Sequence, residues 1–408
     1  MGLLTCLACS ASSATPSDRT SGGRPSSTAG SSASGSTGNP TQPVGSGGTT
    51  GPVIEVPMDQ GGRGMGCNDL EVIPKPVTPT VLILVDNSSS MFEPREQLWD
   101  LLFNSLMNPT EGVVKPLQEK VRFGFASYKG STMITTEDSP TCAEIAKVDY
   151  ALNNYDAINT TYTQLGTQWK QGTKWETPTG HAIQRVAADL AAYAPDPPGP
   201  KYILLVTDGN PNTCQVVDPQ CGQDLSIKAV QDARAKGIGT FAVGIGDIVA
   251  NNTGCEPAWG RCGVNHLQDL ANAGQGLPVA APPETFVWQS CADRYGRVLQ
   301  GADAAAGTAP GTAPYFTATN AAELKTALQG LLNSVVSCTF DMNARVVGNP
   351  ALGSVSLGSD AVTFGDPNGW TLEPTMTQVT LQGTACSTFK AAEKPLSISF
   401  PCEVAVPR

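Results

Sequence analysis

A short apolar run that ends in small, oxygen-bearing side chains constrains the fold of this chain more than any other stretch. Residues 81–85 read Val-Leu-Ile-Leu-Val and are followed at once by Asp86-Asn-Ser-Ser-Ser. An unbroken apolar run of this length, ended by polar residues, predicts a strand that is buried on both faces, as in a parallel sheet. Asp86, Ser88 and Ser90 stand at alternate positions directly after it. Because open α/β sheets bind ligands at the carboxyl ends of their strands, these three side chains are candidate ligands of a hard cation.

Apolar strand patterns alternate with helical patterns over the middle of the chain. Strands are predicted at residues 80–85, 121–128, 201–207, 238–245 and 315–317, and helices at residues 93–106, 179–193, 224–236, 266–273 and 320–336. This alternation predicts a doubly wound, mostly parallel α/β sheet, a Rossmann-like architecture. The polar stretch from 129 to 176 has no such pattern, so we expect a loop whose aromatic side chains contribute packing rather than a binding platform.

Composition divides the 408 residues into four parts. Residues 1–9 resemble a truncated signal sequence with a lipobox-like end. Residues 10–66 are dominated by Ser, Gly, Thr and Pro and predict a disordered tether. We expect the α/β domain at residues 67–338, with an inserted excursion at about residues 279–314. Short β-like runs separated by turn residues predict a small antiparallel β domain at residues 339–408.

Charge and histidine content narrow the range of functions. The net charge of −11 and the pI of about 4.7 argue against nucleic acid or anionic lipid as the main partner, and they are compatible with recruiting divalent cations. The chain has two histidines, His181 and His266, and neither lies in a zinc or hydrolase motif. We therefore expect no catalytic residues and no enzyme activity, and we expect His181 to lie on the surface of a helix.

Two later motifs can complete the ligand set that the first stretch begins. Thr177 opens the sequence Thr-Pro-Thr-Gly at the start of a predicted helix, and Asp208 ends the strand-like run Leu-Leu-Val-Thr-Asp. Both are expected at the same edge of the sheet as Asp86. Caps of turns and helices explain Ser, Thr and Asp individually at such positions. They do not explain the three motifs together in this order.

The order of these motifs resembles the von Willebrand factor type A domain and its metal-ion-dependent adhesion site. The resemblance extends from just before the first apolar strand to the last amphipathic helix of the α/β region. It implies that Ser88 and Ser90 bind a divalent cation directly, and that Asp86, Thr177 and Asp208 bind it directly or through water.

Oxygen donors of this kind suit Mg²⁺, which we expect, or else Ca²⁺ or Mn²⁺. Only two of the five are carboxylates, so the ion remains short of negative ligands. One coordination position can then be completed by an Asp or Glu carboxylate of a protein partner. The sequence therefore predicts an adhesion or protein-binding module that acts without catalysis. A structural or assembly role in the cell envelope, with the cation secondary, is the alternative.

Twelve cysteines without paired CxxC spacing indicate disulfides and an oxidising compartment, with a scatter of buried free thiols as the alternative. The candidate pairs are Cys214–Cys221, Cys255–Cys262, Cys386–Cys402 and, because the termini of the type A domain lie near one another in that family, Cys67–Cys338. Cys9 is the candidate lipidated residue. We expect a secreted or surface-tethered protein of the bacterial envelope, held to the membrane only through such an anchor, since no apolar run is long enough to span one.

Overall fold

The computed structural model of the protein describes residues 69–93, 97–131, 142–214, 219–246, 263–280, 309–318, 320–392 and 394–408. The expected tether at residues 10–66 and most of the expected excursion at 279–314 lie outside these ranges, as do Cys9, Cys67, Cys255 and Cys262. Within the described part of the chain, no helix has the length and apolar character that crossing a membrane requires.

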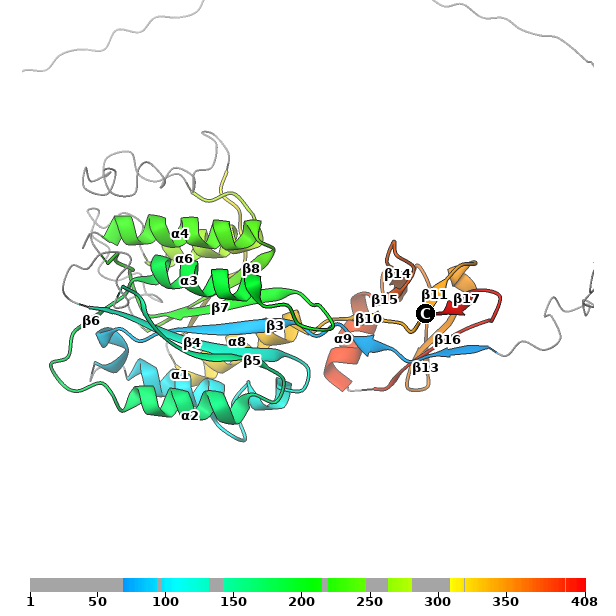
Figure 1. Cartoon of the computed structure of the whole chain (residues 1–408), viewed down its shortest axis with the longest axis horizontal. Coiled ribbons are helices and arrows are strands. Elements are labelled where there is room, and N and C mark those ends of the chain that lie inside the picture. The colour runs from blue at the N-terminus through cyan, green and yellow to red at the C-terminus, as the bar shows by residue number, and fades with distance from the viewer. Residues whose placement is uncertain are drawn as a thin grey trace, which may run out of the picture. The chain divides into compact units, whose positions relative to one another are not determined.

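A seven-stranded sheet forms the middle layer of the α/β region (Figure 1). Its strands follow the order β5-β4-β3-β7-β8-β9, and β6 pairs with the end of β4. The bounds are β3 Thr80–Asp86, β4 Arg122–Ser131, β5 Glu144–Ala151, β6 Trp175–Glu176, β7 Lys201–Thr207, β8 Ile238–Ile245 and β9 Phe316–Ala318. Strands β5 and β6 run antiparallel to β4, and the other five run parallel. The predicted doubly wound, mostly parallel sheet is therefore confirmed.

The order of the strands creates a switch point beside β3. From β3 the chain moves to β4 on one side, and it later returns to β7 on the other side. Such a reversal leaves a crevice at the carboxyl ends of two neighbouring strands, which is where α/β sheets bind ligands. Asp86 ends β3 and Asp208 directly follows β7. Both carboxylates therefore stand at the switch point.

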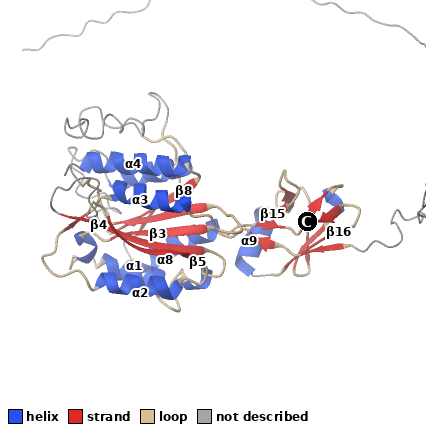
Figure 2. Ribbon diagram, in the orientation of Figure 1, coloured by secondary structure: helices blue, strands red, loops and turns tan. Residues whose placement is uncertain are grey.

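Helices cover both faces of the sheet, as Figure 2 shows. One face carries α1 (Leu98–Met107), α2 (Tyr155–Gly166) and α8 (Ala321–Val335), and the other carries α3 (Thr179–Ala192), α4 (Pro219–Ala235) and α6 (Gly263–Gln275). Alternate residues of β3 serve the two cores: Val81, Ile83 and Val85 pack on the first face, and Leu82 and Leu84 on the second. A strand covered on both sides needs apolar residues at every position, which explains the unbroken run.

The stretch that we expected to be a loop contains strand β5 and helix α2. Side chains of β5 alternate between exposed and half-buried, and α2 buries Tyr155, Ile158, Tyr162 and Leu165 at helical spacing. Strand β5 lies at an edge and has one exposed face, and the buried stripe of α2 is narrow and partly aromatic. Both therefore carry few aliphatic residues, and neither pattern was recognised. The two tyrosines are core residues of a helix rather than loop residues.

Helix α8 begins at a side-chain cap. The Oδ1 atom of Asn320 accepts hydrogen bonds from the backbone N–H groups of Ala322 (3.1 Å) and Glu323 (3.0 Å). Asn320→Ala should lower the free energy of unfolding, measured by urea denaturation, by about 1 kcal/mol, because both donors lose this acceptor. Asn333→Ala, at an exposed position of the same helix, should change it by less than about 0.5 kcal/mol. Equal losses in the two variants would contradict the capping role.

Small antiparallel sheets form the second folded region. The strand orders are β1-β16-β12-β13 and β14-β15-β10-β2, and β11 pairs with β17. The bounds are β1 Leu70–Val72, β2 Lys75–Pro76, β10 Thr339–Asp341, β11 Ala344–Val346, β12 Ser354–Leu357, β13 Asp360–Val362, β14 Trp370–Leu372, β15 Gln378–Leu381, β16 Leu396–Phe400 and β17 Ala405–Pro407. The predicted β-rich region is confirmed. However, β1 and β2 pair with its strands although they precede β3 and lie inside the range 67–338 expected for the α/β domain. Helix α9 (Gly383–Ala392) was not expected either.

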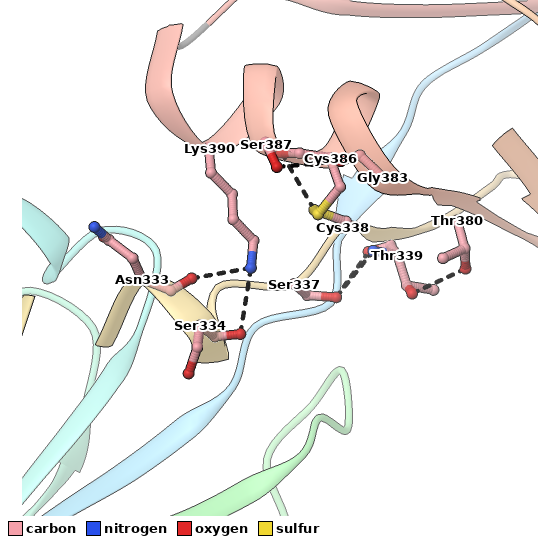
Figure 3. Close-up of a disulfide and its surroundings, with 10 residues drawn as sticks. All are labelled: Asn333, Ser334, Ser337, Cys338, Thr339, Thr380, Gly383, Cys386, Ser387 and Lys390. Atoms are coloured by element: carbon pink, nitrogen blue, oxygen red, sulfur yellow. Dashed lines mark hydrogen bonds between the residues drawn. A yellow bond between two sulfur atoms is a disulfide. The ribbon is translucent and has the colours of Figure 1, made fainter. Parts of the chain in front are cut away.

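Two disulfides join described residues. Cys338, just before β10, is bonded to Cys386 on α9, with the two Cα atoms 5.6 Å apart (Figure 3). Cys142, in the turn before β5, is bonded to Cys214 in the loop after β7, with the Cα atoms 5.3 Å apart. Both bridges connect segments that are distant in the sequence.

Three of the predicted cysteine pairs are wrong as a consequence. These are Cys67–Cys338, Cys214–Cys221 and Cys386–Cys402. Cys221 and Cys402 are nevertheless disulfide-bonded. The predictions assumed that cysteines near in sequence are near in space. Instead, the unexpected helix α9 carries Cys386 to Cys338, and the turn before β5 carries Cys142 to Cys214.

Helix α9 also holds the end of α8. The Nζ atom of Lys390 donates hydrogen bonds to the backbone carbonyls of Asn333 (2.9 Å) and Ser334 (3.2 Å), as Figure 3 shows. Carbonyl groups in the last turn of a helix lack partners within the helix, and the helix dipole favours a cation there. Burial lowers the pKa of Lys390, so these contacts compensate a partly desolvated charge.

Candidate cation site

Asp86 fixes the first loop of the site. It is fully buried at the end of β3, where its Oδ1 atom accepts a hydrogen bond from the backbone N–H of Ser88 (2.8 Å). Its Oδ2 atom accepts one from the hydroxyl of Thr207, the last residue of β7 (2.8 Å). The carboxylate thus shapes the turn that follows its own strand and also ties the ends of two neighbouring strands together.

Ser88 and Ser90 bring their hydroxyl oxygens within 3.0 Å of each other. Ser88 is buried and Ser90 is exposed, so the pair reaches the surface. The 3.0 Å spacing is that of a hydrogen bond between the two hydroxyls, and it is also compatible with two adjacent ligands of one divalent cation.

Ser89, between these two serines, anchors the loop that leads to Thr177. Its hydroxyl donates a hydrogen bond to the carbonyl of Thr173 (2.8 Å) and accepts one from the N–H of Trp175 (2.6 Å). Phe92, two residues beyond Ser90, stacks on Trp169 and meets the edge of Trp175. Trp169 contributes loop packing as expected, whereas Trp175 belongs to strand β6. Their contacts with Phe92 join the loop after β3 to the segment before Thr177.

Thr177 is positioned through its backbone by the third loop. Its N–H donates to Oδ1 of Asn212 (3.1 Å), and its carbonyl accepts from the N–H of Asn212 (3.0 Å). The side-chain amide of Asn212 also donates to the carboxylate of Glu176. Asn212 lies four residues after Asp208 in the sequence, so one residue sets the distance between two of the loops that carry candidate ligands.

Tyr128 of β4 pairs in register with Asp86 of β3 and contacts the start of helix α3. Its hydroxyl is 2.9 Å from Oγ1 of Thr179, in the first turn of α3. Burial raises its pKa well above the ordinary value, and the nearby charges of Asp86 and Asp208 raise it further. The phenol therefore stays protonated beside the carboxylates. Asp208 itself is only 5% exposed.

Burial also raises the pKa of Asp86, to about 6, although its hydrogen bonds with the Ser88 N–H and the Thr207 hydroxyl lower it. The raised pKa means that burial of the charged carboxylate costs free energy. A positive charge beside it would therefore stabilise it strongly. The loops therefore hold negative charge that a cation can neutralise.

In metal-free protein, the charge on Asp86 should make stability depend on pH. The folded-state pKa lies above the unfolded value of about 3.9, so the folded protein binds more protons between about pH 4 and pH 6 and loses stability as the pH rises through that window. We expect a loss of roughly 2–3 kcal/mol, measured by urea denaturation at each pH, that Asp86→Asn removes. Asp156→Asn, an exposed control on α2, should keep the wild-type profile. Identical profiles for wild type and Asp86→Asn would refute the assignment.

Comparison with known families agrees with this geometry. Residues 80–256 match the family model described as "von Willebrand factor type A domain". This region is a type A domain. The match begins at β3 and extends past β8, and β9 and α8 continue the same sheet and helical layer beyond it. No curated protein matches the chain.

Solved structures with similar folds include three proteins from distant sources. The pilus adhesin SpaC from Lactobacillus rhamnosus GG has 12% identity and a TM-score of 0.39, over 82% of this chain and 39% of that one. Proximal thread matrix protein 1 of the mussel byssus, with a zinc-occupied MIDAS motif, has 14% identity and a TM-score of 0.34, over 65% and 50%. Manganese-loaded Plasmodium vivax TRAP protein has 11% identity and a TM-score of 0.33, over 58% and 78%. The present chain thus spans about half or less of the length of SpaC and of the mussel protein.

Asp86, Ser88 and Ser90 thus stand at and just after the end of β3, Asp208 stands just after β7, and Thr177 is bonded through its backbone to Asn212 in the loop after β7. Sequence reasoning missed the residues that position them, namely Ser89, Tyr128, Thr207 and Asn212. Thr207 lies in the Leu-Val-Thr-Asp run that identified Asp208. The sequence of that run does not reveal that the Thr207 hydroxyl bonds to Asp86. Asn212 follows a proline in a turn, where asparagine is common for local reasons.

Proposed function

We propose that the type A domain binds a protein partner through a divalent cation held by Asp86, Ser88, Ser90, Thr177 and Asp208. Mg²⁺ is the expected ion. When bound, it supplies a positive charge with a coordination position that a carboxylate of the partner can occupy. The chain contributes the geometry: it orients two carboxylates and at least two hydroxyls from separate loops.

The observation that carries the proposal is the contact between the two strand ends. The Thr207 hydroxyl bonds to Asp86, which ties the end of β7 to the end of β3, and Asp208 is the residue after Thr207. This contact supports a site shared by the loops that follow the two strands. Because the hydroxyl ligands are neutral, two carboxylates alone leave the ion electrophilic. Such a site favours an acidic ligand and does not itself require a nucleophile or a general base, so the proposed role is binding without catalysis.

An extracytoplasmic location belongs to the same proposal. Six described cysteines are disulfide-bonded, and disulfides persist in oxidising compartments. Attachment to a bacterial envelope through lipidated Cys9, and a tether over residues 10–66, remain predictions from the sequence. Metabolic labelling with a fatty acid, compared between wild type and Cys9→Ser, tests the anchor separately from the binding site.

A selection from random displayed peptides in Mg²⁺ tests the binding function. The selected peptides should share an Asp or Glu, and their affinity should be lost in EDTA, in Asp208→Ala, and when the shared acidic residue is replaced by its amide. Circular dichroism of Asp208→Ala, with Asp156→Ala as the matched control, checks that the fold survives.

Binding that is unchanged in EDTA would end the proposal. If a partner captured from the native envelope binds equally in Mg²⁺ and EDTA, and binding is lost when residues 339–408 are removed, the assembly role with a secondary cation becomes the better account. The same envelope capture with Asp208→Ala separates the two.

A further inference from the structure

His181 lies in a place that the sequence did not lead us to expect. It was predicted to be on a helix surface, but it is only 6% exposed in the first turns of α3. It faces the disulfide between Cys142 and Cys214: its ring nitrogen and the two Sγ atoms all lie within 4.8 Å of one another. The proposed cation site uses none of these three side chains.

The three residues come from three separate segments: the turn before β5, helix α3, and the loop after β7. Two sulfurs and an imidazole nitrogen are the donor set that thiophilic ions such as Zn²⁺ prefer, with thiolate and imidazole bonds of about 2.0–2.3 Å. The oxygen donors of the proposed site at the sheet edge instead suit hard cations such as Mg²⁺. In the described part of the chain this is the one group of three or more His, Cys, Asp or Glu side chains close enough to share an ion.

We propose that Cys142, His181 and Cys214 form a second metal site, for a thiophilic divalent cation such as Zn²⁺, when the disulfide between the cysteines is reduced. The oxidised form has no thiolate to offer and does not bind the ion. The disulfide and the metal complex join the same segments, so a cross-link is present in both states. This proposal does not depend on the site at the sheet edge.

The chemistry balances with a dithiol as the reductant. The dithiol gives two electrons and two protons to the S–S bond, becomes a cyclic disulfide, and leaves Cys142 and Cys214 as two thiols. The metal ion then displaces both thiol protons to solvent and forms two sulfur bonds and one bond to the neutral imidazole. Water completes the fourth position.

Cobalt is a suitable probe because thiolate bonds to Co²⁺ absorb intensely in the near ultraviolet, whereas oxygen ligands do not. The full chain is reduced with a dithiol, freed of it without oxygen, and titrated with Co²⁺. Wild type should show the thiolate band, and Zn²⁺ should abolish it. The oxidised protein and the reduced double variant Cys142→Ser/Cys214→Ser should lack the part of this thiolate band that comes from Cys142 and Cys214. His181→Ala should bind Co²⁺ at least about tenfold more weakly. Even the loss of a residue that only hydrogen-bonds to a metal ligand lowers metal affinity by about this factor.

Two controls separate this site from others. Asp208→Ala should keep the band, because it affects only the site at the sheet edge. Cys338→Ser/Cys386→Ser, which removes the other described disulfide, should keep it as well. A missing band in reduced wild type, or an equal band in Cys142→Ser/Cys214→Ser, would overturn the proposal.

Thermal unfolding gives a second readout. Zn²⁺ should raise the Tm of reduced Asp208→Ala, which lacks a carboxylate of the sheet-edge site, and leave the Tm of reduced Asp208→Ala/Cys142→Ser/Cys214→Ser unchanged, since an ion that binds only the folded state stabilises it. Reduced wild type that stays unfolded with and without Zn²⁺ would also overturn the proposal.

Discussion

Replacing Asp208 with asparagine should weaken Mg²⁺ binding by at least about a hundredfold, as isothermal titration calorimetry of the metal alone would measure. At an effective dielectric constant of about 20, two unit charges about 4 Å apart interact by about 4 kcal/mol, and a hundredfold change corresponds to about 2.8 kcal/mol. The amide keeps the shape of the Asp208 side chain, which is 5% exposed, so the loss reports charge rather than packing.

Ser88→Ala should cost less, about tenfold, because it removes a neutral donor and leaves both carboxylates in place. Asp156→Asn, an exposed carboxylate on α2, should leave the affinity unchanged. The ranking of the variants is the decisive result. If Asp208→Asn and Asp156→Asn bind Mg²⁺ equally, Asp208 is a strand-end residue with no role at the ion.

The parts of this site that could be predicted are those that depend on short stretches of sequence. The run before Asp86 is apolar at every position because helices cover both faces of β3. On β7 the last five residues are also buried, and four of them are apolar; the fifth, Thr207, stands directly before Asp208. Two buried parallel strands, with an aspartate at the end of one and directly after the other, bring the carboxylates to one sheet edge whenever the strands are neighbours.

What could not be predicted depends on contacts between distant segments. Asn212 holds Thr177 through both of its backbone hydrogen-bonding groups, and Ser89 holds Thr173 and Trp175. Each of these side chains also has a common local use in turns, so the sequence alone favours the local explanation. Long-range polar contacts fix the loops, and no periodicity marks them.

The cysteines illustrate the same limit. Spacing along the chain favoured bridges that close short loops, but the observed bridges are 72 and 48 residues apart in sequence. Cross-links over long loops restrict the unfolded chain more, so stability gives no preference for the short pairs. Only the positions of β5 and α9, which the sequence patterns did not reveal, determine which sulfurs meet.

The double variant Cys142→Ser/Cys214→Ser should lower the free energy of unfolding by about 4 kcal/mol, as measured by urea denaturation without metal. The two residues are 72 positions apart, and closing a loop of that length removes about this much chain entropy from the unfolded state. Domains are commonly stable by about 5–15 kcal/mol, so the variant should still fold. Cys338→Ser/Cys386→Ser, with a loop of 48 residues, should lose nearly the same amount.

The two variants should differ in their affinity for Mg²⁺, although their stabilities are similar. Cys214 lies six residues after Asp208, in the loop that also contains Asn212, which positions Thr177. Without its bridge to Cys142, that loop must be ordered when the ion binds, and each residue ordered costs about 1–2 kcal/mol. Cys142→Ser/Cys214→Ser should therefore bind Mg²⁺ at least about tenfold more weakly than wild type. The bridge between Cys338 and Cys386 packs in the core of the second folded region, so its variant should keep wild-type affinity. Equal affinities in both variants would mean that the bridge from Cys142 stabilises the fold without positioning the site.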